Sequence, residues 1–122
     1  MDLSDNHIQL IPPEIGELQL TALYLSNNPL SLAPPDNLFT ITTLRHLTLK
    51  SVGLEQLSPK VGRLVELERL DVAHNRLTAI PEQITRLTRL REASFAYNQI
   101  ASPIPLGLGW STSLVSLDIA VR

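Results

Sequence analysis

The chain has 122 residues, of which 43% are hydrophobic and 18% charged, and its formal net charge is −2. This is the composition of one folded globular domain, not of a disordered or fibrous chain. The near-neutral charge gives no electrostatic basis for nucleic-acid binding, the lack of cysteine excludes disulfides and thiolate metal sites, and no apolar run approaches the ~18 residues of a membrane span.

The N-terminal sequence MDLSDNHIQ lacks the basic start and the apolar core of a signal peptide. No Asn-x-Ser/Thr glycosylation site occurs in the chain. Together with the lack of cysteine, these features favour a cytoplasmic protein.

One pattern of apolar residues repeats along the chain, and residues 67–89 are its clearest copy. In that copy the pattern consists of Leu67, Leu70, Val72, Asn75, Leu77, Ile80 and Pro81. The copies begin at Leu20, Leu44, Leu67, Leu90 and Leu114, which are 24, 23, 23 and 24 residues apart. A fixed period of this length predicts a solenoid, in which stacked coils bury the side chains that a single coil leaves exposed.

In chain order, the copies divide one domain into a partial repeat, four full repeats and a second partial repeat: 1–19, 20–43, 44–66, 67–89, 90–113 and 114–122. The second full repeat has Val52 in the asparagine place, and its proline, Pro59, arrives one residue late. Neither end carries a capping unit. We therefore expect either a fragment of a longer protein or a small protein that associates through its ends.

Each copy is expected to contain one short strand, because its fourth and sixth residues are two apart and share one face of an extended chain. In residues 67–89 this places Leu70 and Val72 inside, and Arg69, Asp71 and Ala73 outside. Parallel strands of successive copies then lie about 4.8 Å apart. The segment that follows each proline returns on the outer side, and the sequence leaves open whether it is 3₁₀, α-helical or irregular.

The L-x-x-L-x-L-x-x-N-x-L spacing resembles that of the leucine-rich repeat family over essentially the whole chain. The tail P-x-x-I-G-x-L at Pro12–Leu18, and the related residues 81–87, are similar to the intracellular subclass of 23-residue repeats. That subclass includes Ras-pathway scaffolds, fungal adenylate cyclases and plant Ras-group proteins. Residues 98–109 instead resemble the plant-receptor pattern N-x-L-x-G-x-I-P-x-x-L-G, with Ser102 in the place of the first glycine. The expected fold is an α/β leucine-rich repeat solenoid, with a curved parallel sheet on the concave side and short helical or irregular returns on the convex side.

An asparagine follows the strand in most copies, at Asn6, Asn28, Asn75 and Asn98. An asparagine side chain offers both donors and an acceptor to the backbone groups of a buried turn. We therefore expect a ladder of hydrogen bonds that links neighbouring coils, with a gap at Val52.

The outward strand positions of successive copies form a polar concave face. Its positions in the second to fifth copies include Ser26, Ala73 and Ala96. Tyrosine and arginine are frequent energetic anchors of interfaces. The predicted protein-binding residues on this face are Tyr24, His46, Lys50, Arg69, Asp71, His74, Glu92 and Tyr97.

Less specific interpretations of these residues stay open. Arg69 and Glu92 occupy the same place in adjacent copies, so they are expected to pair with each other. A mixed polar face also serves solubility alone, and binding on the convex side or at an edge is an alternative. Trp110 is expected to pack against the next coil, with an exposed contact role as the alternative.

Catalysis and metal binding find little support in the sequence. Ser51, Asp71 and His74 are the nearest approach to a nucleophile with a base and an acid, but Asp71 and His74 are separated by ~10 Å of extended chain. The histidines stand in different repeats, and no phosphate-binding glycine loop occurs. We expect no catalytic residue, no metal, no cofactor and no small-molecule substrate.

The resemblance implies a non-catalytic protein-interaction module, such as an intracellular signalling scaffold with a small GTPase or another signalling protein as its partner. The alternative is the recognition or regulatory segment of a larger enzyme, such as a kinase, cyclase or ubiquitin ligase.

Overall fold

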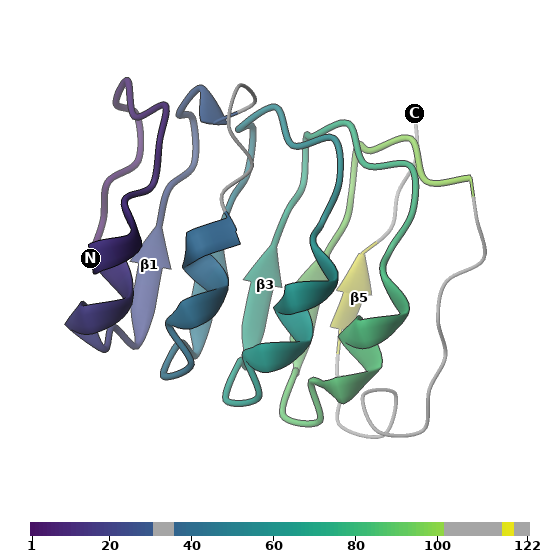
Figure 1. The fold of residues 1–122 in the computed structure, drawn as a ribbon. Coiled ribbons are helices and arrows are strands. Elements are labelled where there is room, and N and C mark those ends of the chain that lie inside the picture. Colours follow the sequence, from purple (N-terminus) through teal and green to yellow (C-terminus); the bar gives the residue numbers. More distant parts are fainter. Residues whose placement is uncertain (31–35, 102–115, 119–122) are drawn as a thin grey trace.

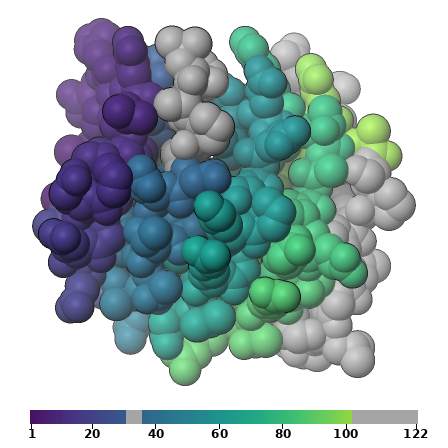
Figure 2. All heavy atoms as spheres, viewed as in Figure 1, coloured from purple at the N-terminus to yellow at the C-terminus, as the bar shows by residue number. Residues whose placement is uncertain are grey.

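The structure is a computed structural model, and it describes residues 1–30 and 36–101 together with the backbone of residues 116–118. The described residues wind through successive coils, in which short strands are followed by turns and return segments (Figure 1). Neighbouring coils pack side by side in sequence order, with the return segments facing the viewer (Figure 2). The predicted solenoid is confirmed.

The strands form one five-stranded parallel sheet in the order β1-β2-β3-β4-β5. Each strand has three residues: β1 is Ala22–Tyr24, β2 His46–Thr48, β3 Arg69–Asp71, β4 Glu92–Ser94 and β5 Ser116–Asp118. Asp2 extends the sheet by a parallel bridge to Tyr24. Equivalent residues of the repeats are paired, because Leu23 lies opposite Leu47 and Leu47 lies opposite Leu70.

The described return segments contain short 3₁₀ helices. These are η1 (Pro13–Leu18), η3 (Asp36–Thr40), η4 (Pro59–Arg63) and η5 (Glu82–Arg86). Proline begins η1 and η4, and it precedes η5, where its fixed φ suits the entry into a helix and its missing N–H costs no bond. The tight i→i+3 bonds, such as Val61 N–H to Ser58 O at 3.0 Å, fit a return of only a few residues.

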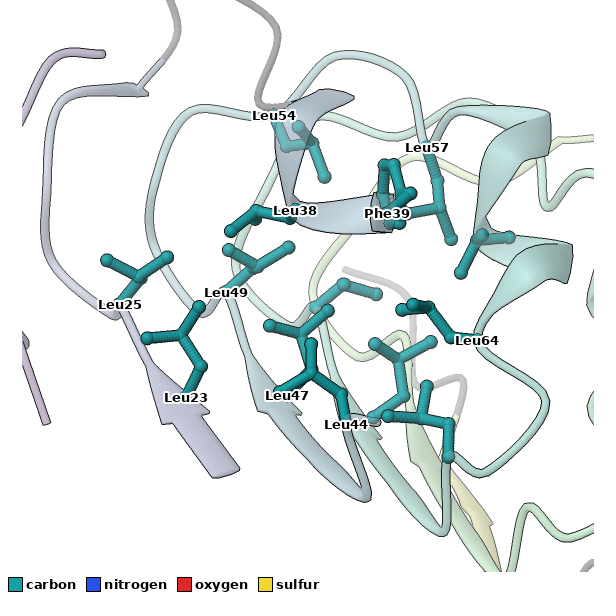
Figure 3. Close-up of a cluster of buried hydrophobic side chains, with 14 of the residues drawn as sticks. Leu23, Leu25, Leu38, Phe39, Leu44, Leu47, Leu49, Leu54, Leu57 and Leu64 are labelled. Carbon is teal, nitrogen blue, oxygen red and sulfur yellow. The ribbon is translucent and has the colours of Figure 1, made fainter. Parts of the chain in front are cut away.

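The leucine pattern forms the core between the sheet and the helices. Leu23, Leu47 and Leu70 are at most 2% exposed, and they point from the strands into the coil. Figure 3 shows strand leucines facing Leu38, Phe39 and Leu64, which come from or follow the return helices. One repeat could not bury these side chains alone, so the core exists only in the stack.

The prediction that Ala73 faces outward is wrong. Ala73 is 5% exposed, and the equivalent Ala96 and Ser26 are 3% and 9% exposed. Strand β3 ends at Asp71, and the chain then turns towards a positive φ at His74. Strict alternation therefore holds as far as Val72, and Ala73 is buried at the turn instead of lying on the concave face.

Candidate functional site

Two rows of side chains cross the outer surface of the sheet. Strand register places His46 beside Arg69 and Arg69 beside Glu92 in one row. The second row runs through Asp2, Tyr24, Thr48, Asp71 and Ser94. Because equivalent residues of parallel strands lie about 4.8 Å apart, each row is a continuous strip of side chains.

The two rows surround a hollow of about 390 Å³ over β1 to β4. Its lining consists of Tyr24, His46, Leu47, Thr48, Arg69, Leu70, Asp71, Glu92, Ala93 and Ser94. Five of the predicted binding residues, Tyr24, His46, Arg69, Asp71 and Glu92, therefore meet at one place. Thr48 and Ser94 also line the hollow; they are not among the predicted binding residues, although they occupy the same place in their repeats as Tyr24 and Asp71.

The remaining predicted residues lie outside the hollow. Lys50 is exposed beyond the end of β2. His74 and Tyr97 stand on successive turns after β3 and β4, where their rings stack with centroids 4.3 Å apart and planes 14° apart. These two residues therefore form an aromatic pair beside the hollow.

The aromatic pair occupies backbone positions that suit smaller residues. The equivalent residue of each turn has a positive φ: Asp5, Asn27, Ser51, His74 and Tyr97 have values of 56–60°. A left-handed conformation is unusual for a bulky side chain such as that of Tyr97, whereas asparagine, aspartate and histidine adopt it more often. Tyr97 is nevertheless 47% exposed, so burial does not explain an aromatic residue at this place.

The charges of the hollow are partly matched. Arg69 Nε lies 3.2 Å from Glu92 Oε2, which confirms the predicted pair between adjacent repeats. Asp71 Oδ1 accepts the N–H of Ala73 at 3.0 Å. In the same row, the backbone N–H of Ser4 donates to Asp2 and lowers the pKa of that carboxyl group. Backbone hydrogen bonds thus orient both carboxylates.

Three asparagines fix the turns beneath this surface. The Nδ2 atoms of Asn28, Asn75 and Asn98 each donate to carbonyls of their own coil and of the preceding coil, at 2.8–3.3 Å. Asn6 differs, because it is exposed and donates within its own coil, to Leu3 O and Ser4 O. The ladder thus links coils at three of the four predicted positions.

Val52 cannot form the side-chain hydrogen bonds of an asparagine, but the nearby backbone groups still have partners. Its N–H donates to Asn75 Oδ1 at 3.0 Å, and the carbonyl of Leu25 accepts from Asn28 Nδ2 at 2.9 Å. The Val52 N–H is therefore bonded by an asparagine of the next coil, and the Leu25 carbonyl is bonded by an asparagine of its own coil.

The described residues offer no arrangement for metal binding, since no three of their histidine, aspartate or glutamate side chains gather as ligands. Within the described part of the chain, no helix has the length and apolar character needed to span a membrane. Trp110 lies outside the described residues.

The family model described as Leucine Rich Repeat matches residues 19–41 and 66–87. The protein flightless-1 homolog of Caenorhabditis elegans is 32% identical over 82% of this chain, and the adenylate cyclase of Schizosaccharomyces pombe is 24% identical over 98%. This chain spans 8% and 7% of the lengths of these two relatives.

A solved structure has the same coil arrangement. The leucine-rich repeat ectodomain of the Arabidopsis receptor kinase HAESA, solved in complex with a peptide hormone ligand, matches 97% of this chain with a TM-score of 0.81 and 30% identity. This chain covers 21% of that one. The repeats, the parallel sheet and these matches agree, and the chain belongs to the leucine-rich repeat family.

Proposed function

We propose that this chain is a non-catalytic protein-interaction module that binds a protein partner on its concave face. The observation that carries the proposal is the hollow over β1 to β4 with the stacked His74–Tyr97 pair beside it. Interfaces draw most of their binding energy from a few aromatic and arginine side chains surrounded by polar groups. Tyr24, Arg69 and Tyr97 provide such side chains on one face.

The backbone of the aromatic pair supports a binding role. A residue held in a sparsely populated conformation costs of order 1–3 kcal/mol, and such residues concentrate at functional sites. The same place holds Asp5, Asn27 and Ser51 in other coils, so the fold itself does not need an aromatic ring there. Binding gives a reason for two exposed aromatic rings at this place, in addition to the stack that they form with each other.

The class of partner is inferred from the family. The HAESA ectodomain was solved with a peptide hormone ligand, which supports a polypeptide partner for a chain of the same fold. The repeat tails of the intracellular type support a cytoplasmic signalling scaffold, with a small GTPase or another signalling protein as its partner.

A second candidate is the recognition or regulatory segment of a larger enzyme. The match to the S. pombe adenylate cyclase favours this candidate, since a stretch similar to this chain forms 7% of that protein. The concave face would then select or regulate what the catalytic part acts on.

Affinity capture from a cell extract, with quantitative mass spectrometry, tests the face. The concave variant carries Tyr24→Thr, His74→Asn and Tyr97→Asn, which place residues already tolerated at equivalent positions of other coils. A matched variant of the convex side carries Arg63→Ala, Glu82→Ala and Arg86→Ala. Proteins captured by wild type should be lost with the concave variant and kept with the convex variant. Equal recovery by all three proteins would exclude the concave face.

A further inference from the structure

In the row Tyr24, Thr48, Asp71, one large ring is followed by two short side chains. The three residues lie on neighbouring strands, with Thr48 between the other two. Two strand spacings separate Tyr24 from Asp71, roughly 10 Å at the backbone. The short threonine therefore leaves space between an aromatic ring and a carboxylate, and this space belongs to the hollow.

The carboxylate of Asp71 is the charge in the hollow that lacks an opposite charge. Its Oδ1 accepts the Ala73 N–H, and among the described residues no basic side chain forms an ion pair with it. The arginine of the same strand, Arg69, pairs instead with Glu92 on the neighbouring β4. Asp71 is only partly exposed, so its charge is less screened than one at a fully exposed position.

We propose that the hollow receives one lysine or arginine side chain of an extended partner segment, held between the ring of Tyr24 and the carboxylate of Asp71. This inference rests on the proposed binding role of the concave face. A cation over a tyrosine ring is attracted by the ring quadrupole, and a carboxylate on its other side adds a charge-assisted hydrogen bond. The aliphatic stem of the basic residue packs over Thr48.

The opposite polarity fits less well. An acidic partner side chain would have to share Arg69 with Glu92, whose Oε2 lies 3.2 Å from Arg69 Nε, and it would be repelled by the carboxylates of both Asp71 and Glu92. The charge left over in the hollow therefore selects a cation.

Selection from a phage-displayed library of random dodecapeptides on the immobilised chain tests this inference. The variant is Asp71→Asn, which keeps an oxygen for the Ala73 N–H and removes the charge. The matched control is Asp2→Asn, because Asp2 lies in the same row and accepts the Ser4 N–H in the same way, but does not line the hollow.

We expect peptides enriched on wild type to share a lysine or arginine at one position. Asp71→Asn should return the frequency of basic residues there to the library background, while Asp2→Asn should leave the enrichment unchanged. A synthetic copy of one enriched peptide, with norleucine or citrulline at that position, should bind wild type at least about tenfold more weakly.

The other outcomes separate the two proposals. Peptides without a shared basic residue, peptides with a shared acidic residue, or equal enrichment on Asp71→Asn would overturn the cation site and leave the binding face standing. If wild type recovers no more phage than the concave variant with Tyr24→Thr, His74→Asn and Tyr97→Asn, both the binding face and the cation site are overturned.

Discussion

The side chain of Asn75 is hydrogen-bonded to the backbone of Val52, the residue in the asparagine place of the preceding coil. Asn75 Oδ1 accepts the N–H groups of Val52 and Leu54, both at 3.0 Å. Its Nδ2 donates to Leu49 O, also in the preceding coil, at 2.8 Å. One side chain thus holds three buried backbone groups of its neighbour.

Replacing Asn75 by alanine should lower the free energy of unfolding markedly. The N–H groups of Val52 and Leu54 would lose their acceptor inside the coil, and leaving a buried polar group unbonded costs about 1–3 kcal/mol. Chemical denaturation monitored by circular dichroism measures the change. Asn6→Ala is the control, because Asn6 is exposed and bonds within its own coil; its effect should stay within about 0.5 kcal/mol. A wild-type midpoint for Asn75→Ala would contradict the structural role of the ladder.

The Arg69–Glu92 pair should add little to stability. The two side chains are 62% and 53% exposed, and pairs of this kind contribute about 0–1 kcal/mol because water and salt screen them. A double-mutant cycle with Arg69→Gln, Glu92→Gln and the double variant measures the coupling directly. A coupling energy above about 2 kcal/mol, beyond the range of exposed pairs, would show that the pair is a structural element of the sheet.

Gly62→Ala should destabilise the convex side. Gly62 lies in η4, and an added Cβ would stand 3.1 Å from Gln83 Cβ and Gln83 O of the next coil. Over-packing of this kind costs about 1–3 kcal/mol because the backbone oxygen cannot move aside without displacing η5. Thermal unfolding measures the loss. Arg63→Ala, at the adjacent exposed residue, is the control. An equal midpoint for the two variants would show that η4 and η5 can move apart at no cost in stability.

Tyr97 should tolerate asparagine better than valine. Asparagine adopts a positive φ, as Asn27 does at the same place, whereas a β-branched residue there is strained by roughly 1–2 kcal/mol. Tyr97→Asn also loses the stack on His74, worth about 0.5–1.5 kcal/mol, so its net change should stay within ~1 kcal/mol. Chemical denaturation of Tyr97→Asn and Tyr97→Val measures the difference in their free energies of unfolding. Equal stabilities would mean that the left-handed turn imposes no strain.

The strands could be predicted because burial dictates them. Residues such as Leu70 and Val72 can enter a core only from an extended chain that presents both to one side. The contact between Arg69 and Glu92 followed from their common place in adjacent repeats, and the structure contains it.

The details that depend on packing between coils could not be predicted. The 3₁₀ form of η4 reflects a short return closely packed on Gln83, which no local pattern encodes. The burial of Ala73 depends on where β3 stops and the turn begins. The sequence predicts His74 and Tyr97 as binding residues but does not predict that their rings stack on each other. The signal was their common place in neighbouring repeats, the same one that revealed the Arg69–Glu92 pair.

The interactions between consecutive coils determine how the solenoid unfolds. The ion pairs Arg45–Glu68, Lys60–Asp36, Arg69–Glu92 and Arg89–Glu66 each join consecutive coils, as do the bonds of Asn75 and Asn98. Each of these interactions couples a coil only to its immediate neighbour, so cooperative unfolding spreads from one coil to the next. Residues 67–89 are bonded to the coil before them and to the coil after them, so a defect there weakens the coupling between the coils on its two sides.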